Sequence, residues 1–587
     1  MDIDKSQAAV IDCMLPRIFV EAPAGYGKTF TMIEKIVEDF RRNLIPNPKK
    51  ILALTFSVNA AKKMKNDIRA KLLQTNYGID NRVDVYNYHA LARHILGLYG
   101  PLLLGVPTDL NKCAQLNESQ VLSHFQKLKL VLNPQTNRVL TSFNAAVRDC
   151  SESDLDDLIN SYNQVLLTEL IPQNCITYNG ILTLAIKVLL EHESIQRLYR
   201  LLYPYVIVDE AQDTNLLSYR LLKLIVGDET RICMFGDSLQ RIYGFIGAIP
   251  DFVERCQLEF GLTSLSLTTN HRFAKGSSMQ LLDLNLRENI KHPTAPSINT
   301  SISVPLFFLA TIKSELQSTC NIVKAIHSVQ PDSTVAILLR SRGFYGSMLP
   351  SVMTKNKIDC FEALFEEDSL EYIEFNQLCI QLLGEVTGHT GESSLADLRR
   401  FEKLINTRIN TMNYEHADSY KQLVRALIAQ IEAELISASP QTKHEFAINI
   451  FENRALCHAL EYIHSHVVIT TMHSAKGLEW DYVIIPEMMQ WVEPAGPLCL
   501  ECAIEKKLSN CRGHKCNIAS TRLPSNYADE LCVFYVAVTR AKRNVIFLAT
   551  TDRVNKSGEQ KTGNLSCFLQ RPGITITSVK NLTDLIM

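Results

Sequence analysis

The sequence predicts an α/β fold in which two parallel-sheet units follow one another and each is interrupted by a mainly helical stretch. Short, β-prone apolar runs alternate with amphipathic helical segments toward both ends of the chain. Residues 97–199 and 361–460 show helical periodicity with few such runs. A turn rich in Ala, Pro and Gly joins the first apolar run to a helix that opens with Lys28-Thr29, which is typical of a phosphate-binding loop.

Length and charge narrow the class of protein. A chain of 587 residues is too long for one core and predicts three or four domains. Its 60 basic and 62 acidic residues give a net charge of −2, so a nucleic-acid surface would have to be a local groove. The chain shows no apolar leader and no apolar run long enough to cross a bilayer. We therefore expect a cytoplasmic protein with mostly reduced cysteines and no membrane partner.

The first strand, turn and helix carry the residues of a nucleotide site. Ile18–Val20 is expected to be a buried strand, and three small residues shape the turn after it, namely Ala24, Gly25 and Gly27. Such a turn lets backbone N–H groups surround phosphate oxygens at a helix N-terminus. Lys28 would reach the β- and γ-phosphates of ATP, and the Thr29 hydroxyl would bind Mg²⁺. The expected apolar face of this helix consists of Phe30, Ile33, Val37 and Phe40.

A second apolar strand supplies the acidic partner that such a loop needs. It runs from Tyr205 to Val208 and ends in Asp209 and Glu210. Asp209 would hold Mg²⁺ through water, and Glu210 would orient or deprotonate the attacking water. The long gap between Lys28 and Asp209 implies that a helical domain is inserted into the first α/β domain.

These residues, with further segments along the chain, resemble those of superfamily 1 DNA helicases of the UvrD/Rep/PcrA type over nearly the whole length of the sequence. The matching segments, in the family's order, are 22–29, 54–56, 209–214, 236–245, 270–272, 471–479 and 535–541. The resemblance implies two RecA-like P-loop NTPase-type domains in tandem, each with an inserted helical domain. The expected ranges are 1–96 with 200–275 for domain 1A, 97–199 for 1B, 276–360 with 461–587 for 2A, and 361–460 for 2B.

The resemblance also implies roles around the nucleotide. Gln7, on its own a surface glutamine in a short helix, would read the edge of adenine. His271 stands where the family usually has a tyrosine stacked on adenine, and Glu479 would hold the ribose. Gln240 would sense the γ-phosphate.

Two arginines and a set of rings complete the implied machinery. Arg272 and Arg540 would act as arginine fingers, although Arg540 on an expected apolar helix from 529 to 542 would otherwise be read as structural. DNA bases would stack on Phe56, His89, Tyr243, Phe245 and His473. Ile246 replaces a usual DNA-contacting arginine, and Val58-Asn59 replace an Asn-Lys pair, so the polar contacts to DNA are expected to be weaker.

A cysteine-rich segment lies outside the family pattern. Its residues are Cys499, Cys502, Cys511, His514 and Cys516, spaced C-x₂-C-x₈-C-x₂-H-x-C. Four of these five ligands would suit tetrahedral Zn²⁺ in a loop that lacks a core of its own. Free cysteines clustered by chance and an iron–sulfur cluster are the alternatives.

The expected function is an ATP-dependent helicase that moves 3′ to 5′ on single-stranded DNA. The alternative from another class is a regulatory ATPase subunit that senses DNA or nucleotide for a separate nuclease in repair or antiviral defence and unwinds little. Small family members in anti-phage systems such as Gabija are similar in size and motif content, which is an analogy only. An RNA helicase is a more distant third.

Overall fold

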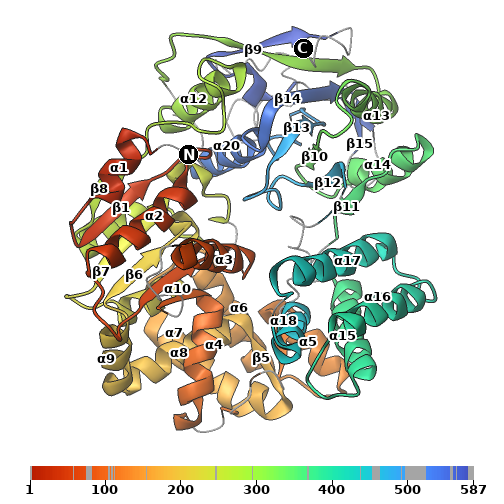
Figure 1. Cartoon of the computed structure of the whole chain (residues 1–587). Helices are drawn as coiled ribbons and strands as arrows, with labels where there is room; N and C mark the ends of the chain where they lie inside the picture. Colours follow the sequence, from red (N-terminus) through yellow and green to blue (C-terminus); the bar gives the residue numbers. More distant parts are fainter. Residues whose placement is uncertain are drawn as a thin grey trace. The chain divides into compact units, whose positions relative to one another are not determined.

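The computed structural model describes residues 3–579 except 57, 75–81, 104–105, 108–109, 111–112, 154, 245–246, 294, 366–368, 437, 453–455, 457–462, 464, 491, 496–523, 551, 555–559 and 563–564. The chain forms two compact units, Met1–Arg272 and Phe273–Met587 (Figure 1). The candidate zinc ligands from Cys499 to Cys516, together with Phe245 and Ile246, lie outside the described residues.

The first unit is built on a parallel sheet with the strand order β3-β2-β6-β7-β1-β8. Its strands are β1 (Arg17–Glu21), β2 (Ile51–Thr55), β3 (Val83–Asn87), β6 (Tyr205–Val208), β7 (Arg231–Gly236) and β8 (Thr263–Ser266). The helices beside them are α1 (Lys5–Ile11), α2 (Lys28–Arg41), α3 (Val58–Gln74), α10 (Leu216–Ile225) and α11 (Phe252–Phe260). Every residue of β2 and β6 is buried, as expected for strands covered on both faces. The carboxyl ends of β1, β7 and β6 therefore meet along one sheet edge.

The chain between β3 and β6 is mainly helical. It contains α4 (Tyr88–Tyr99), α5 (Glu118–Lys127), α6 (Pro134–Arg148), α7 (Leu155–Val165), α8 (Tyr178–Glu191) and α9 (Glu193–Leu202), with a two-stranded ladder of β4 (Ala114–Leu116) and β5 (Cys175–Thr177). The apolar periodicity of the sequence predicts single helices over 118–132 and 181–202, and both predicted ranges are wrong. The first ends at Lys127 because Lys129 adopts φ +58°, and the second breaks at His192, which leaves the helical region. One apolar core joins these helices to Leu52, Leu54 and Val206 of the sheet.

The second unit contains a parallel sheet with the strand order β11-β12-β10-β13-β14-β9-β17. Its strands are β9 (Ile302–Leu309), β10 (Val335–Leu339), β11 (Phe361–Ala363), β12 (Val467–Thr471), β13 (Trp480–Ile485), β14 (Ala541–Thr550) and β17 (Ile574–Ser578); a separate antiparallel pair is β15 (Asp552–Val554) and β16 (Gln560–Thr562). The helices flanking the sheet are α12 (Ser278–Lys291), α13 (Ile312–Val329), α14 (Phe344–Lys355) and α20 (Pro524–Val538).

Between β11 and β12 the second unit is again helical. The helices there are α15 (Leu370–Thr387), α16 (Leu395–Ile409), α17 (Ala417–Glu434) and α18 (Pro440–Glu452). The predicted fold class, tandem RecA-like α/β units that each carry a mainly helical insertion, is confirmed. The residue ranges assigned to domains 1A, 1B, 2A and 2B stay a prediction.

The helix expected from 529 to 542 ends earlier, at Val538. Strand β14 begins at Ala541, which pairs with Trp480 of β13, and the Trp480 N–H donates a 3.0 Å hydrogen bond to the Arg540 carbonyl. Sheet pairing thus outweighs the helical preference of these residues. Arg540 lies in the turn between α20 and β14, and not on the helix.

The buried face of α2 also differs from the predicted one. Phe30 and Val37 are only half-buried, whereas the fully or nearly fully buried side chains are Thr31, Met32, Ile33, Lys35, Ile36, Asp39 and Phe40. Lys35 and Asp39 are 1% and 0% exposed. A buried charge is costly unless it is paired. Apolar periodicity therefore does not predict a buried helix face that includes Lys35 and Asp39.

Two carboxylates lie near each other in the second unit, one fully buried (Glu315) and one half-buried (Glu487). Glu315, in the first turn of α13, is 0% exposed, and one of its oxygens accepts a 2.7 Å hydrogen bond from the Glu487 backbone N–H. Burial raises the pKa of Glu315 to about 7. Burial, together with the nearby Glu315, raises the pKa of Glu487 to about 8.

We expect Glu315→Gln to reduce a loss of stability that wild type suffers as pH rises. The folded pKa of each acid lies above its ordinary value of 4.5, so the unfolded chain releases protons that the folded chain retains, and stability is lost from about pH 4.5 through about pH 8. For Glu315 this loss is on the order of 3 kcal/mol. Thermal unfolding at pH values near both ends of this window checks it, with the surface substitution Glu385→Gln as control. An equal fall in Tm in wild type and Glu315→Gln would contradict the expectation.

Candidate nucleotide-binding site

The loop between β1 and α2 is held in a conformation that requires glycine. Gly25 and Gly27 have φ of +82° and +77°, the left-handed region that side chains disfavour. A Cβ on Gly25 would lie 2.6 Å from the Cβ of Arg272, and one on Gly27 would lie 2.5 Å from Gln7 Nε2. Ala24, just before them, is buried. Two of the residues predicted to act on nucleotide therefore pack directly against the backbone of the loop, at the N-terminus of a helix.

Lys28 opens α2 and meets both acids at the end of β6. Its Nζ lies 2.9 Å from Asp209 Oδ1 and also pairs with Glu210 Oε1. Burial opposes the charge, but the two carboxylates raise the pKa of Lys28 above its usual value, so the ammonium stays charged. For Asp209 burial dominates and, with the nearby Glu210, raises its pKa against the lowering effect of Lys28.

The donor atoms at this place suit Mg²⁺. Two carboxylates face one ammonium, which leaves negative charge that a further cation would balance. Asp209 offers a carboxylate oxygen, and Thr29, next to Lys28 in the first turn of α2, offers a hydroxyl; hard oxygen ligands of this kind are those that Mg²⁺ prefers. The predicted magnesium ligands are thus compatible with the structure, and their role stays a prediction.

A chain of hydrogen bonds connects Glu210 to Gln240 through a residue that had no predicted role. Gln212 Nε2 donates to Glu210 Oε2 at 2.6 Å, and Gln212 Oε1 accepts from the Asp237 N–H at 3.1 Å. Gln240 Nε2 in turn donates to Asp237 Oδ2 at 2.8 Å. A Cβ on Gly236 would lie 2.8 Å from Gln212 Oε1, so the glycine leaves room for this chain. Gln212 could have been identified as a candidate from the sequence by its position within the acidic segment 209–214.

Gln7 is fully buried, so the expectation of a surface glutamine for that residue taken alone was wrong. Asp4 Oδ1 accepts from the Gln7 N–H at 3.0 Å, and Gln7 Oε1 accepts from the Asp4 N–H at 3.1 Å, a capping box that fixes the orientation of the amide. Gln7 Nε2 is buried and has no hydrogen-bond partner among the residues that the structure describes. A ligand with an acceptor atom beside the phosphate loop would satisfy it.

His271 joins this side of the loop. Its Nε2 lies 2.9 Å from Asp4 Oδ2, and its backbone N–H donates to the Gly25 carbonyl at 2.7 Å. Although burial acts in the opposite direction, hydrogen bonds from Ser6, the Gln7 backbone and His271 lower the pKa of Asp4 to about 2. Asp4 is therefore ionised at neutral pH and orients both Gln7 and His271.

The predicted stacking rings of the first unit fall into two places. Phe56 and Tyr243 stack on each other, with ring centroids 4.7 Å apart and 23° between the ring planes. His89 lies in the first turn of α4, edge-on to Tyr178 with centroids 6.1 Å apart. Burial and the nearby Arg93 lower the pKa of His89 to about 4, so this ring is neutral at pH 7.

The second unit holds three predicted site residues at two edges of its sheet. Arg540, 3% exposed, donates from Nε to the Val536 carbonyl at 2.8 Å and from a terminal nitrogen to the Leu478 carbonyl at 3.3 Å. Glu479 follows Leu478 at the amino end of β13, so these two predicted nucleotide contacts lie close together. His473 follows the carboxyl end of β12, and burial, with the nearby cations, lowers its pKa to about 4.

The described residues contain neither a cluster of metal ligands nor a membrane-spanning helix. No group of three or more His, Cys, Asp or Glu side chains in the described ranges could hold a metal ion. No helix in the part of the chain that the structure describes is both long and apolar enough to cross a membrane. Zinc at Cys499–Cys516 stays a prediction of the sequence.

The fold and site together define a P-loop nucleoside triphosphatase built from two RecA-like units. Residues 3–261 match the family described as the UvrD/REP helicase N-terminal domain. The first unit is therefore similar to the N-terminal domain of UvrD-type helicases, which are ATP-dependent enzymes.

Curated relatives agree with this assignment at low identity. The chain is 22% identical to a probable DNA helicase II homolog of Mycoplasma pneumoniae, over 93% of this chain and 84% of the relative. It is 23% identical to DNA helicase II of Rickettsia typhi, over 89% and 88% of the two chains. The ATP-dependent DNA helicase Rep of Buchnera aphidicola is 25% identical over 49% of this chain and 44% of its own length.

We expect Gln212→Leu to lower kcat for ATP on the order of 10²-fold, with a much smaller change in KM. Leucine fills the same space but removes both hydrogen bonds, so Glu210 and Gln240 lose their fixed relation while the phosphate loop is intact. Steady-state hydrolysis rates check this, with Gln164→Leu on the exposed face of α7 as the matched control. A wild-type kcat in Gln212→Leu would show that the chain of hydrogen bonds has no part in turnover.

Proposed function

We propose that this protein is a DNA helicase that couples ATP hydrolysis to 3′-to-5′ movement along single-stranded DNA. The observation that carries the proposal is the connected path from Lys28 through Glu210 and Gln212 to Gln240, three residues before Tyr243. Tyr243 belongs to the stacked ring pair. The relatives named as DNA helicases support DNA as the substrate.

In this mechanism the first unit binds ATP through its loop. Backbone N–H groups and Lys28 hold the phosphates, Gln7 reads the base edge with its unpaired Nε2, and His271 lies beside the base. Lys28 would exchange its carboxylate partners for phosphate oxygens. Mg²⁺ bound through Asp209 and Thr29 would neutralise charge on the phosphates. Glu210 would then orient or deprotonate the attacking water.

Charge that develops on the γ-phosphate would be neutralised by arginines from both units. By family resemblance, Arg272 and Arg540 serve this role and Glu479 holds the ribose. Arg540 is held by backbone carbonyls, so it would have to leave them to reach a phosphate. Because such fingers contribute about 10³–10⁵ in rate, hydrolysis would depend on closure of the two units around one ATP.

The rings of the proposed DNA path suit a strand of any sequence. Bases stack on aromatic faces without reading base edges, and Phe56 and Tyr243 form one such platform. His89 and His473 are neutral at pH 7, so they would contribute stacking and not phosphate attraction. Phe245, which lies outside the described residues, stays a predicted stacking residue.

The test combines hydrolysis and unwinding. We expect ATP hydrolysis to be stimulated by single-stranded DNA, a duplex with a 3′ tail to be unwound, and Lys28→Ala to abolish both, because no other described side chain replaces the ammonium at the acids of β6. Wild-type turnover in Lys28→Ala would remove Lys28 from the site. Hydrolysis without unwinding would instead support a regulatory ATPase subunit that works with a separate nuclease.

A second experiment separates the strand contact from the ATP site. We expect Phe56→Ala and Tyr243→Ala each to weaken single-stranded DNA binding by about 1–3 kcal/mol, while hydrolysis without DNA changes little. Fluorescence anisotropy with a labelled oligonucleotide measures this, and Phe308→Ala, which removes an exposed ring from β9, is the control. Unchanged affinity in both variants would place the strand elsewhere.

A further inference from the structure

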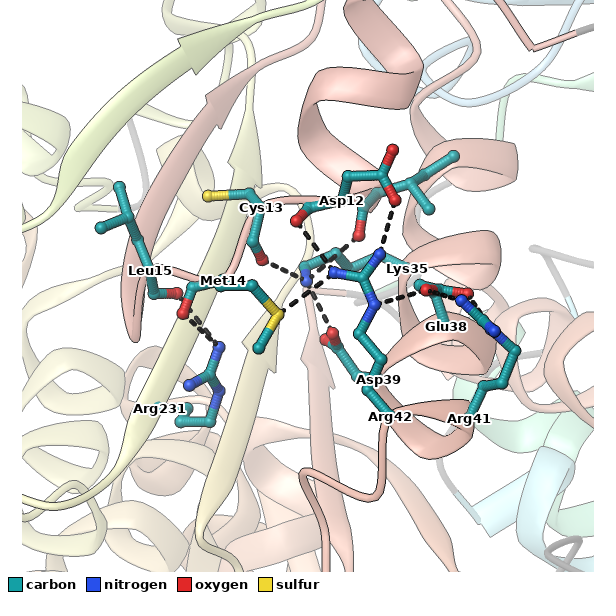
Figure 2. Close-up of polar contacts among 11 residues, drawn as sticks. Asp12, Cys13, Met14, Leu15, Lys35, Glu38, Asp39, Arg41, Arg42 and Arg231 are labelled. Carbon is teal, nitrogen blue, oxygen red and sulfur yellow. Dashed lines mark hydrogen bonds and ion pairs between the residues drawn. The ribbon is translucent and has the colours of Figure 1, made fainter.

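The linker between α1 and β1, residues 12–16, is held by an unusual number of hydrogen bonds. Each of six consecutive backbone carbonyls, from Ile11 to Pro16, accepts one. Only the last comes from a neighbouring strand, from the Ile232 N–H at 2.8 Å. The other five come from cationic side chains (Figure 2).

Lys35 of α2 reaches two of these carbonyls. Its Nζ lies 2.8 Å from the Cys13 oxygen and 3.4 Å from the Ile11 oxygen. The same ammonium pairs with Asp39 Oδ1 at 2.7 Å, one helical turn further along α2. Both side chains are buried, so Asp39 balances the charge that Lys35 brings to the linker.

Two arginines hold the rest of the linker. Arg42, just after α2, donates to the Asp12 carbonyl at 3.0 Å and to the Asp12 carboxylate at 2.6 Å. Arg231, at the start of β7, donates to the Met14 and Leu15 carbonyls at 3.1 and 3.2 Å. Glu38 pairs with Arg42 and fixes its guanidinium from the side of α2 (Figure 2). We call Lys35, Arg42 and Arg231 the linker clamp.

The clamp joins the two helices that would meet a nucleotide. Helix α1, whose Gln7 lies against Gly27, ends at Ile11, so the linker begins where that helix stops. Helix α2 begins with Lys28, and Lys35 stands two turns further along on nearly the same face. The helix that follows the phosphate loop therefore also holds the linker after α1, the helix that carries Gln7.

We propose that the linker clamp is a positioning device for Gln7 and thereby sets the preference of this site for adenine over guanine nucleotides. The inference rests on the proposed function, in which Gln7 reads the base. A helix of seven residues is marginally stable in isolation, so its position depends on contacts with the rest of the unit, and the clamp supplies those at its C-terminal end. Selection between bases depends on the placement of one donor to within a fraction of an ångström, and the clamp supplies the anchorage.

The test compares ATP and GTP as substrates. Lys35→Met alone would leave Asp39 buried without its cation, so the first variant is the double substitution Lys35→Met/Asp39→Leu, and the second is Arg42→Gln at a partly exposed position. We expect KM for ATP to rise about 10-fold and the ratio of kcat/KM for ATP to that for GTP to fall about 10-fold, with kcat for ATP within about 2-fold of wild type. Arg41→Gln, which removes an exposed arginine that pairs with Glu38, is the control.

The outcomes separate the clamp from the assignment of Gln7. Gln7→Ala is measured alongside, and a loss of ATP preference in Gln7→Ala and in the clamp variants supports the proposal. Loss in Gln7→Ala with unchanged KM and preference in folded clamp variants overturns the clamp alone. No loss in Gln7→Ala overturns the assignment of the base reader and the clamp with it. If the double variant does not fold, Arg42→Gln decides by the same criteria.

Discussion

The Lys28 ammonium between Asp209 and Glu210 is the interaction on which the rest of the first unit's site depends. It joins the loop after β1 to the end of β6, although β7 lies between these strands. Parallel strands are about 4.8 Å apart, so the two ends are separated by roughly 10 Å, which the loop and a long side chain together can span. The pair can form only because the carboxyl ends of all three strands lie at one edge.

Strand β7, between β6 and β1, contributes to the site because its last residue has no side chain. Strand β7 ends at Gly236, where any Cβ would collide with Gln212. The space left by the glycine is filled by the Gln212 amide, which turns one face to Glu210 and the other to Asp237. Because the amide has both a donor and an acceptor, it can connect a carboxylate to a backbone N–H, which a hydroxyl or a carboxylate could do less well. The hydrogen-bonded path from Glu210 to Gln240 therefore depends on the absence of a side chain at Gly236.

Much of this arrangement could be predicted from the sequence. The apolar runs that form β1, β2 and β6 are buried on both faces, so their continuous apolar composition is enough to predict buried strands. The residues Lys28, Asp209 and Glu210 follow such runs, and parallel pairing brings strand ends together whatever the loops do. Element ends were less predictable, since α20 stops at Val538 in response to the pairing of Ala541 with β13, a contact distant in sequence.

The buried polar contacts could not be predicted, for a physical reason. In the sequence, Lys35 and Asp39 have the spacing of an exposed i, i+4 ion pair. Their burial is explained only by the structure, in which linker carbonyls accept hydrogen bonds from Lys35. The same holds for Gln7, whose burial depends on a capping box at its own helix and on the absence of a side chain at Gly27. In both cases one decisive partner, the linker carbonyls for Lys35 and Gly27 for Gln7, lies outside the local sequence. Both contacts converge on α2, so the helix that presents phosphate donors at one end is fixed, through buried polar groups, to the segment that carries the base-side amide.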